Sequence, residues 1–137
     1  MRIYHLFISH SWRYGDAYVK LISLLRNDRS FVFRDYSVPK INPILGMRSD
    51  KSLSLAIREK MSHSTVVVVL AGVYATYSKW IDEELRIATE DFDPKKPIVA
   101  VAPWGSQKTS VPVKRVADRI VQWNKRSILR GIREVVK

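Results

Sequence analysis

The feature that most constrains this chain is an uninterrupted apolar run at residues 65–72, Thr-Val-Val-Val-Val-Leu-Ala-Gly. The run is too short for a helix of that polarity. A strand with one face in water would instead alternate apolar and polar residues. A short, continuous and valine-rich run is typical of a parallel strand that is buried on both faces. Parallel strands need crossover helices, and these helices cover both faces of the sheet. The run therefore predicts an α/β fold.

The rest of the chain alternates in the same way. Further strands are predicted at residues 2–8, 31–34, 96–102 and within 116–123. Apolar residues at helical spacing predict helices at about 13–26, from Ser49 or Asp50 past Met61, after Ser78, and after Asn124, which is a suitable N-cap. At 137 residues the chain has the size of one domain. We expect a single flavodoxin-like three-layer sandwich over residues 1–137, with a central parallel sheet of four to five strands.

Composition excludes several classes of protein. The chain is 46% hydrophobic and 27% charged, which is globular composition, and no apolar run reaches the roughly 18 residues that a membrane span needs. It has no cysteine, which excludes disulfides, zinc–thiolate sites and cysteine nucleophiles, and which fits a reducing cytoplasm. The three histidines, His5, His10 and His63, fall on separate elements without carboxylates at ligand spacing, so no metal site is expected.

The net charge of +11 indicates an anionic partner or surface. Residues 108–137 hold nine basic and two acidic residues, so +7 of that charge lies there. Exposed aromatic residues that could stack on bases are missing from this stretch, apart from Trp123. The pattern therefore favours a solvated outer face of the last helix over a nucleic-acid site.

Polar and aromatic residues gather where the predicted strands end, the place where open α/β sheets bind ligands. Aromatic rings beside small hydroxyls suit a nucleotide through stacking and hydrogen bonds. The glycine-rich loops that bind phosphates or dinucleotides, GxxxxGK[ST] and GxGxxG, are absent, as are the acidic residues of a phospho-accepting receiver domain. The predicted nucleotide-binding residues are Ser9, His10, Ser11, Trp12, Asp35, Tyr36, Ser37, Tyr74, Ser78 and Trp80.

A carboxylate in the helix after the apolar run, Glu84, would carry the chemistry. Its negative charge would be most effective in stabilising a positive charge that develops on a sugar ring, as in the cleavage of a glycosidic bond. The residues alone leave open that Glu84 is a solvated acid which complements the helix N-terminus, as Asp82 and Glu83 in the same turn would do.

Three segments resemble the motifs of TIR domains, in the same order. Residues 7–11, Phe-Ile-Ser-His-Ser, resemble the first box, and residues 33–39 resemble the second strand and the BB loop. Residues 78–85 resemble the signature of serine, tryptophan and catalytic glutamate. The likeness extends over essentially the whole chain and is greatest to the bacterial TIR subunit of the Thoeris anti-phage system. The chain departs from many TIR domains at Ile81, where cysteine is frequent, and at His10, where an aromatic residue often stands.

The resemblance implies an enzyme that cleaves the nicotinamide–ribose bond of NAD. Its product would be a signal nucleotide derived from ADP-ribose, either a cyclic ADP-ribose isomer or a conjugate such as histidine-ADP-ribose, which a separate effector protein reads. Glu84 would be catalytic, because it lies one helical turn after Trp80, whereas Glu83 would point elsewhere. No cofactor beyond NAD as substrate is implied. Self-assembly through the BB loop, residues 35–46, would complete the site.

Two other functions stay open. A TIR-type adaptor or scaffold would bind protein partners through the BB loop without turnover, but adaptors commonly lack the glutamate that this chain keeps. A basic nucleic-acid-binding α/β domain would rest on charge alone.

Overall fold

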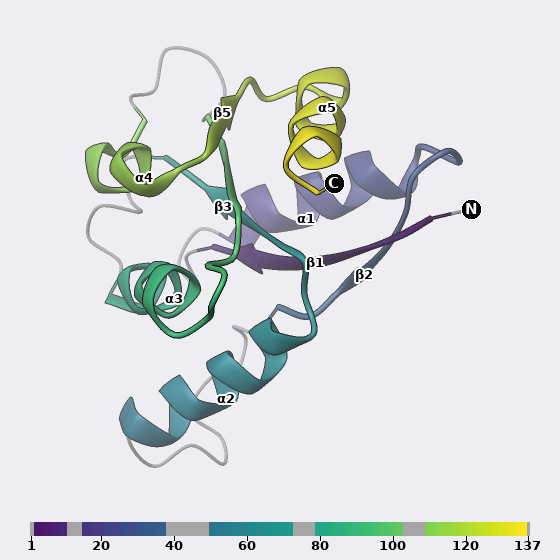
Figure 1. The fold of residues 1–137 in the computed structure, drawn as a ribbon. Coiled ribbons are helices and arrows are strands. Elements are labelled where there is room, and N and C mark those ends of the chain that lie inside the picture. Colours follow the sequence, from purple (N-terminus) through teal and green to yellow (C-terminus); the bar gives the residue numbers. More distant parts are fainter. Residues whose placement is uncertain (1, 11–14, 38–49, 73–78, 103–108, 137) are drawn as a thin grey trace.

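The computed structural model describes residues 2–10, 15–37, 50–72, 79–102 and 109–136 and has a five-stranded sheet at its centre (Figure 1). All paired strands are parallel, and their order is β2-β1-β3-β4-β5. This is the flavodoxin-like arrangement that the sequence predicts. The elements in chain order are β1 (Ile3–Ser9), α1 (Gly15–Arg26), β2 (Val32–Asp35), α2 (Asp50–Ser62), β3 (Val66–Leu70), α3 (Lys79–Glu90), β4 (Ile98–Val101), α4 (Val111–Val116), β5 (Arg119–Val121) and α5 (Lys125–Val135).

The apolar run forms β3, the middle strand. It lies between β1 and β4, and all five of its residues are buried. The prediction of a strand covered on both faces is therefore confirmed. Burial of a valine side chain contributes on the order of 1.5–3 kcal/mol, so this strand anchors the sheet.

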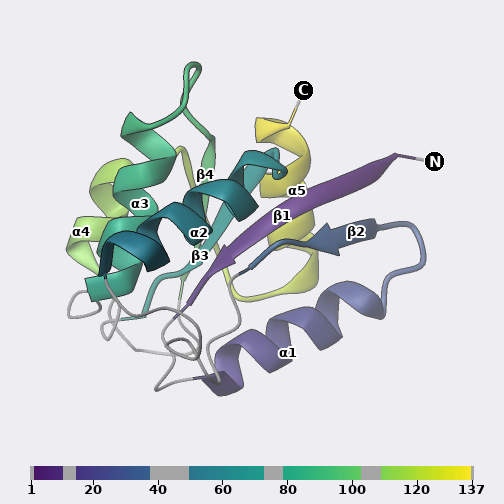
Figure 2. The ribbon, with the colours of Figure 1, turned by 90° about the horizontal axis from the view of Figure 1, so that it is seen from below.

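The helices form two layers, one on each face of the sheet (Figures 1 and 2). One face is covered by α1 and α5, and residues of both helices pack with Val66 and Val68 of β3. The opposite face is covered by α2, α3 and α4, which pack with Val67 and Val69. Successive strand residues point to opposite faces, so β3 serves both layers.

The closing helix begins where the sequence predicts. The side chain of Asn124 accepts a hydrogen bond from the backbone N–H of Ser127 at 2.8 Å, which confirms it as the N-cap of α5. Helix α4 was not predicted. It has six residues and a proline in its first turn, and Val113 is its buried residue. A helix of six residues is too short to show a repeating apolar spacing, so the sequence pattern does not predict it.

Gly131 lies inside α5, close to the sheet. A Cβ at this position would lie 2.6 Å from Cγ1 of Val121 and 3.4 Å from Cγ1 of Val99. Glycine is therefore required here by close packing and not by backbone conformation.

We expect Gly131→Ala to lower the free energy of unfolding by about 1 kcal/mol. Alanine gains up to about 1 kcal/mol over glycine inside a helix, but overpacking costs about 1–3 kcal/mol, and the stiff χ1 of Val121 resists relief. Urea denaturation measures the change. In a double-mutant cycle, Val121→Ala should cost less in the Gly131→Ala background than in the wild type. A Gly131→Ala protein more stable than the wild type would show that the helix moves away at no cost.

Candidate functional site

The carboxylate of Glu84 lies at the centre of the candidate site. Glu84 is in the second turn of α3 and has no exposed surface. Its Oε1 accepts a hydrogen bond of 2.9 Å from Oγ of Ser9, which is equally buried. A hydrogen bond from a hydroxyl to a buried carboxylate is charge-assisted, and it fixes the position of the oxygen atom that receives it.

The sheet topology brings these two residues together. Ser9 is the last residue of β1 and pairs with Val69 near the carboxyl end of β3, the strand that precedes α3. The side chain of Phe7, two residues earlier, packs in the α2–α3 layer, and the strand alternation directs Ser9 to the same side. The pair therefore occupies the carboxyl end of the two central strands, where ligands bind in such sheets.

The neighbouring Glu83 has a different environment. Its carboxylate accepts a hydrogen bond from Oγ of Ser54 on α2 and one of 2.6 Å from Nε of Arg86. These bonds hold the pKa of Glu83 below its usual value, and the bond from Arg86 lowers it more than the bond from Ser54. Glu83 thus links α2 to α3 while Glu84 points to Ser9. The two carboxylates therefore point to different sides of α3, as the helical period predicts.

A second polar cluster joins β1, α1 and β2. The ring of His10 stacks on that of Tyr18 with their centroids 4.2 Å apart, and the hydroxyl of Tyr18 donates to Asp35. Asp35 also accepts from the backbone N–H of Ser37 at 2.8 Å and from its hydroxyl. The Ser37 oxygen in turn accepts from the backbone N–H of Ile8 at 2.8 Å. The structure therefore brings three predicted residues, His10, Asp35 and Ser37, into one network.

Tyr18 completes this network, although the sequence pattern predicts only the helix at about 13–26 that contains it. Its phenol pKa is raised, first by burial and then by the hydrogen bond to Asp35. Nothing in the local sequence distinguishes a tyrosine that packs from one whose hydroxyl finds a carboxylate 17 positions away.

The side chain of Tyr36 belongs to neither of these two clusters. Its hydroxyl lies 3.1 Å from Nδ1 of His5, and its ring stacks with that of His63 at 5.7 Å. His5 precedes Ser9 by four residues, about 13 Å along a strand at the usual rise. The side chain of Tyr36 therefore lies apart from the pair of Ser9 and Glu84.

Trp80 is the one remaining predicted site residue that lies in the described ranges. Trp80 is half-buried and packs against the α2–α3 layer, with Nζ of Lys79 at 5.2 Å from its ring. Ser11, Trp12, Tyr74 and Ser78 lie outside the described residues, as does the BB loop beyond residue 37.

Among the described residues, no group of three or more histidine, aspartate or glutamate side chains could hold a metal ion. No helix in these ranges has the length and apolar character to cross a membrane.

Comparison with known proteins identifies one family. The family model described as "Thoeris protein ThsB, TIR-like domain" matches residues 7–108, about three quarters of the chain. The match includes the last three residues of β1, all of β2 and helix α3, and thus both Ser9 and Glu84. A search of curated proteins found no match.

Proposed function

The chain belongs to the family of the TIR-like domain of Thoeris protein ThsB, and we propose that in anti-phage defence it cleaves the bond between nicotinamide and ribose in NAD. The observation that carries this proposal is the buried carboxylate of Glu84, bonded to Ser9 at the carboxyl end of the central strands.

The chemistry needs a negative charge at this position. When the glycosidic bond breaks, its electron pair leaves with nicotinamide and a positive charge develops on the ribose. A preorganised carboxylate stabilises that charge, and it does so far more strongly where water is excluded. Water that then attacks the ribose carbon yields ADP-ribose and a proton. A nitrogen of the same nucleotide or of an added amino acid would instead yield a cyclic product or a conjugate, the signal that a separate effector would read.

Substrate must first reach the carboxylate. The Glu84 side chain is fully covered in this structure, so contact with NAD requires the covering groups to move. We expect turnover to depend on self-assembly, with the BB loop at the contact between copies.

The network around Tyr18 would position the substrate. His10 is a buried residue, 5% exposed, and Asp35 and Ser37 hold the ends of β1 and β2 together. We propose that Ser11, Trp12, Tyr74, Ser78 and Trp80 complete the nucleotide-binding surface with them.

The test is mass spectrometry of NAD incubated with the purified full chain. Parallel reactions would contain added histidine or lysate from infected cells. We expect free nicotinamide and a second product that retains the ADP-ribose mass or its histidine conjugate. If NAD stays intact in every reaction, including one at a protein concentration that produces assembly, the proposal is wrong and a non-catalytic adaptor is favoured.

A further inference from the structure

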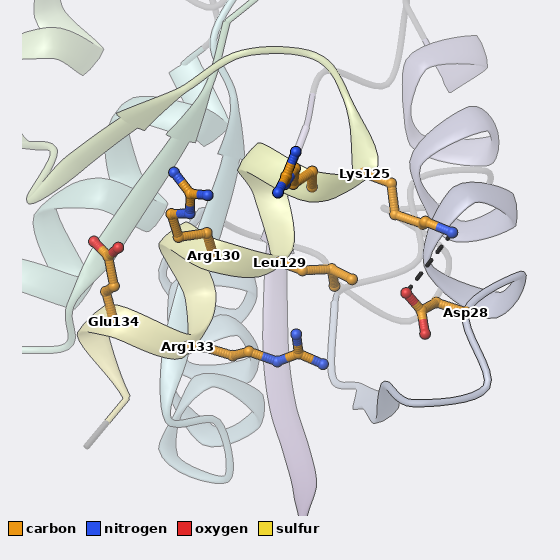
Figure 3. A pocket seen from close by; sticks show the side chains of 7 residues that line it. Asp28, Lys125, Leu129, Arg130, Arg133 and Glu134 are labelled. Atoms are coloured by element: carbon orange, nitrogen blue, oxygen red, sulfur yellow. Dashed lines mark ion pairs between the residues drawn. The ribbon is translucent and has the colours of Figure 1, made fainter.

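The outer face of α5 forms a basic groove with the turn that follows α1 (Figure 3). The groove has a volume of about 510 Å³ and lies on the α1–α5 side of the sheet, opposite the layer that holds Glu84. Its lining residues are Asp28, Lys125, Arg126, Leu129, Arg130, Arg133 and Glu134.

Both acidic residues of the groove are already engaged. Asp28 faces Nζ of Lys125 at 3.8 Å (Figure 3). It also accepts bonds from the backbone N–H and the hydroxyl of Ser30. The bonds from Ser30 hold the pKa of Asp28 below its usual value, so its carboxylate stays ionised and paired with Lys125. Glu134 pairs with Arg119 at 3.3 Å, outside the groove.

Two arginines are left for a ligand. Among the described residues, Arg126 and Arg130 have no acidic partner, and both side chains are exposed. Their spacing of four residues places them on one stripe of α5, about 6 Å apart along the helix axis. Arg133 follows near the hydroxyl of Ser30, and the buried Leu129 forms the apolar floor. The planar guanidinium groups of these arginines are spaced along the helix, and each can bind one of several successive phosphate groups.

We propose that this groove binds the phosphodiester backbone of a nucleic acid without reading its sequence. None of the lining residues is aromatic, so the base of a free nucleotide would find no stacking partner, whereas a backbone needs only its phosphates contacted. The sequence pattern favoured a solvated face. The structure adds that these cations share one groove and that its two acids are already paired, Asp28 with Lys125 within the groove and Glu134 with Arg119 outside it. This binding is independent of the proposed NAD cleavage.

The test is fluorescence anisotropy of a labelled DNA duplex of about 20 base pairs with the full chain, between 50 and 200 mM salt. We expect binding that weakens with salt and is equal for duplexes of unrelated sequence. Arg126→Glu with Arg130→Glu should weaken it at least tenfold and lower the salt slope by about 2, since two phosphate contacts are lost. Arg126→Gln with Arg130→Gln should weaken it in the same direction, and circular dichroism verifies that each variant is folded.

The matched control is Lys114→Glu with Arg115→Glu on α4, which are also exposed and change the net charge by the same amount. This variant should stay within about threefold of the wild type. An equal loss in both variants would mean that net charge alone attracts DNA, and the groove would not be the site. Absence of binding at 50 mM salt would also overturn the proposal, as would inorganic pyrophosphate that binds as tightly as the duplex.

Discussion

Glu84→Gln should reduce nicotinamide release by the assembled protein about a hundred- to a thousandfold, because it removes the preorganised carboxylate that we propose stabilises the transition state. Glutamine has nearly the same shape, so the packing of α3 is kept and Oε1 still accepts from Ser9. What is lost is the charge that would stabilise the ribosyl cation. Turnover is measured as nicotinamide released from NAD, with urea denaturation as the check on folding.

Glu83→Gln is the matched control, since it makes the same chemical change one residue earlier. Its carboxylate contacts Ser54 and Arg86 on the side of α2, so turnover should stay within a few-fold of the wild type. If Glu83→Gln abolishes turnover and Glu84→Gln does not, the assignment of the catalytic carboxylate is wrong. If neither change matters, the enzyme proposal fails.

Glu83→Gln should also change the stability of the folded chain. The pKa of Glu83 is lowered in the folded chain by Arg86 and Ser54, so its ionised form stabilises the fold above the usual glutamate pKa. That contribution is lost as the pH falls through the lowered value. The wild type should therefore be more stable than Glu83→Gln at neutral pH, and the difference should disappear in acid. A difference that is constant with pH would assign the effect to packing.

Ser9→Ala should lower kcat for NAD cleavage at least tenfold and change KM by no more than a few-fold. We expect Ser9 to act through Glu84, as a positioning residue: without its hydroxyl the buried carboxylate loses a charge-assisted bond and its fixed position. A misplacement of about 1 Å in a catalytic group costs up to about a hundredfold. The free energy of unfolding should fall by about 1–3 kcal/mol. Steady-state kinetics and urea denaturation measure the two effects.

Ser64→Ala separates positioning from the general loss of a buried hydroxyl. Ser64 is 2% exposed and donates to the carbonyl of Met61 at 2.7 Å in the turn after α2. Its removal should cost stability but leave kcat unchanged. Ser9→Ala should add little to the defect of Glu84→Gln, because both act on one carboxylate. Additive losses would show that Ser9 acts independently of Glu84.

The sequence alone determined the architecture, because the responsible forces are local and periodic. The valine run predicted a strand buried on both faces, and β3 is the middle strand. Asn124 predicted the start of α5, since its side chain caps a backbone N–H only three residues ahead. The register of α3 followed from the helical period, which separates Glu84 from Glu83 by about 100°.

The tertiary structure decided which side chains meet, because those contacts join segments that are distant in the chain. Ser9 and Glu84 are 75 positions apart, and only the pairing of β1 with β3 brings them together. Parallel pairing likewise carried Tyr36 toward His5 instead of toward the carboxylate. The basic groove depends on α5 packing beside the turn that holds Asp28. The charge and the helical or strand period can be read from residues that are neighbours in the sequence. The partner of a buried polar group depends instead on how the crossover connections arrange the strands and helices in space.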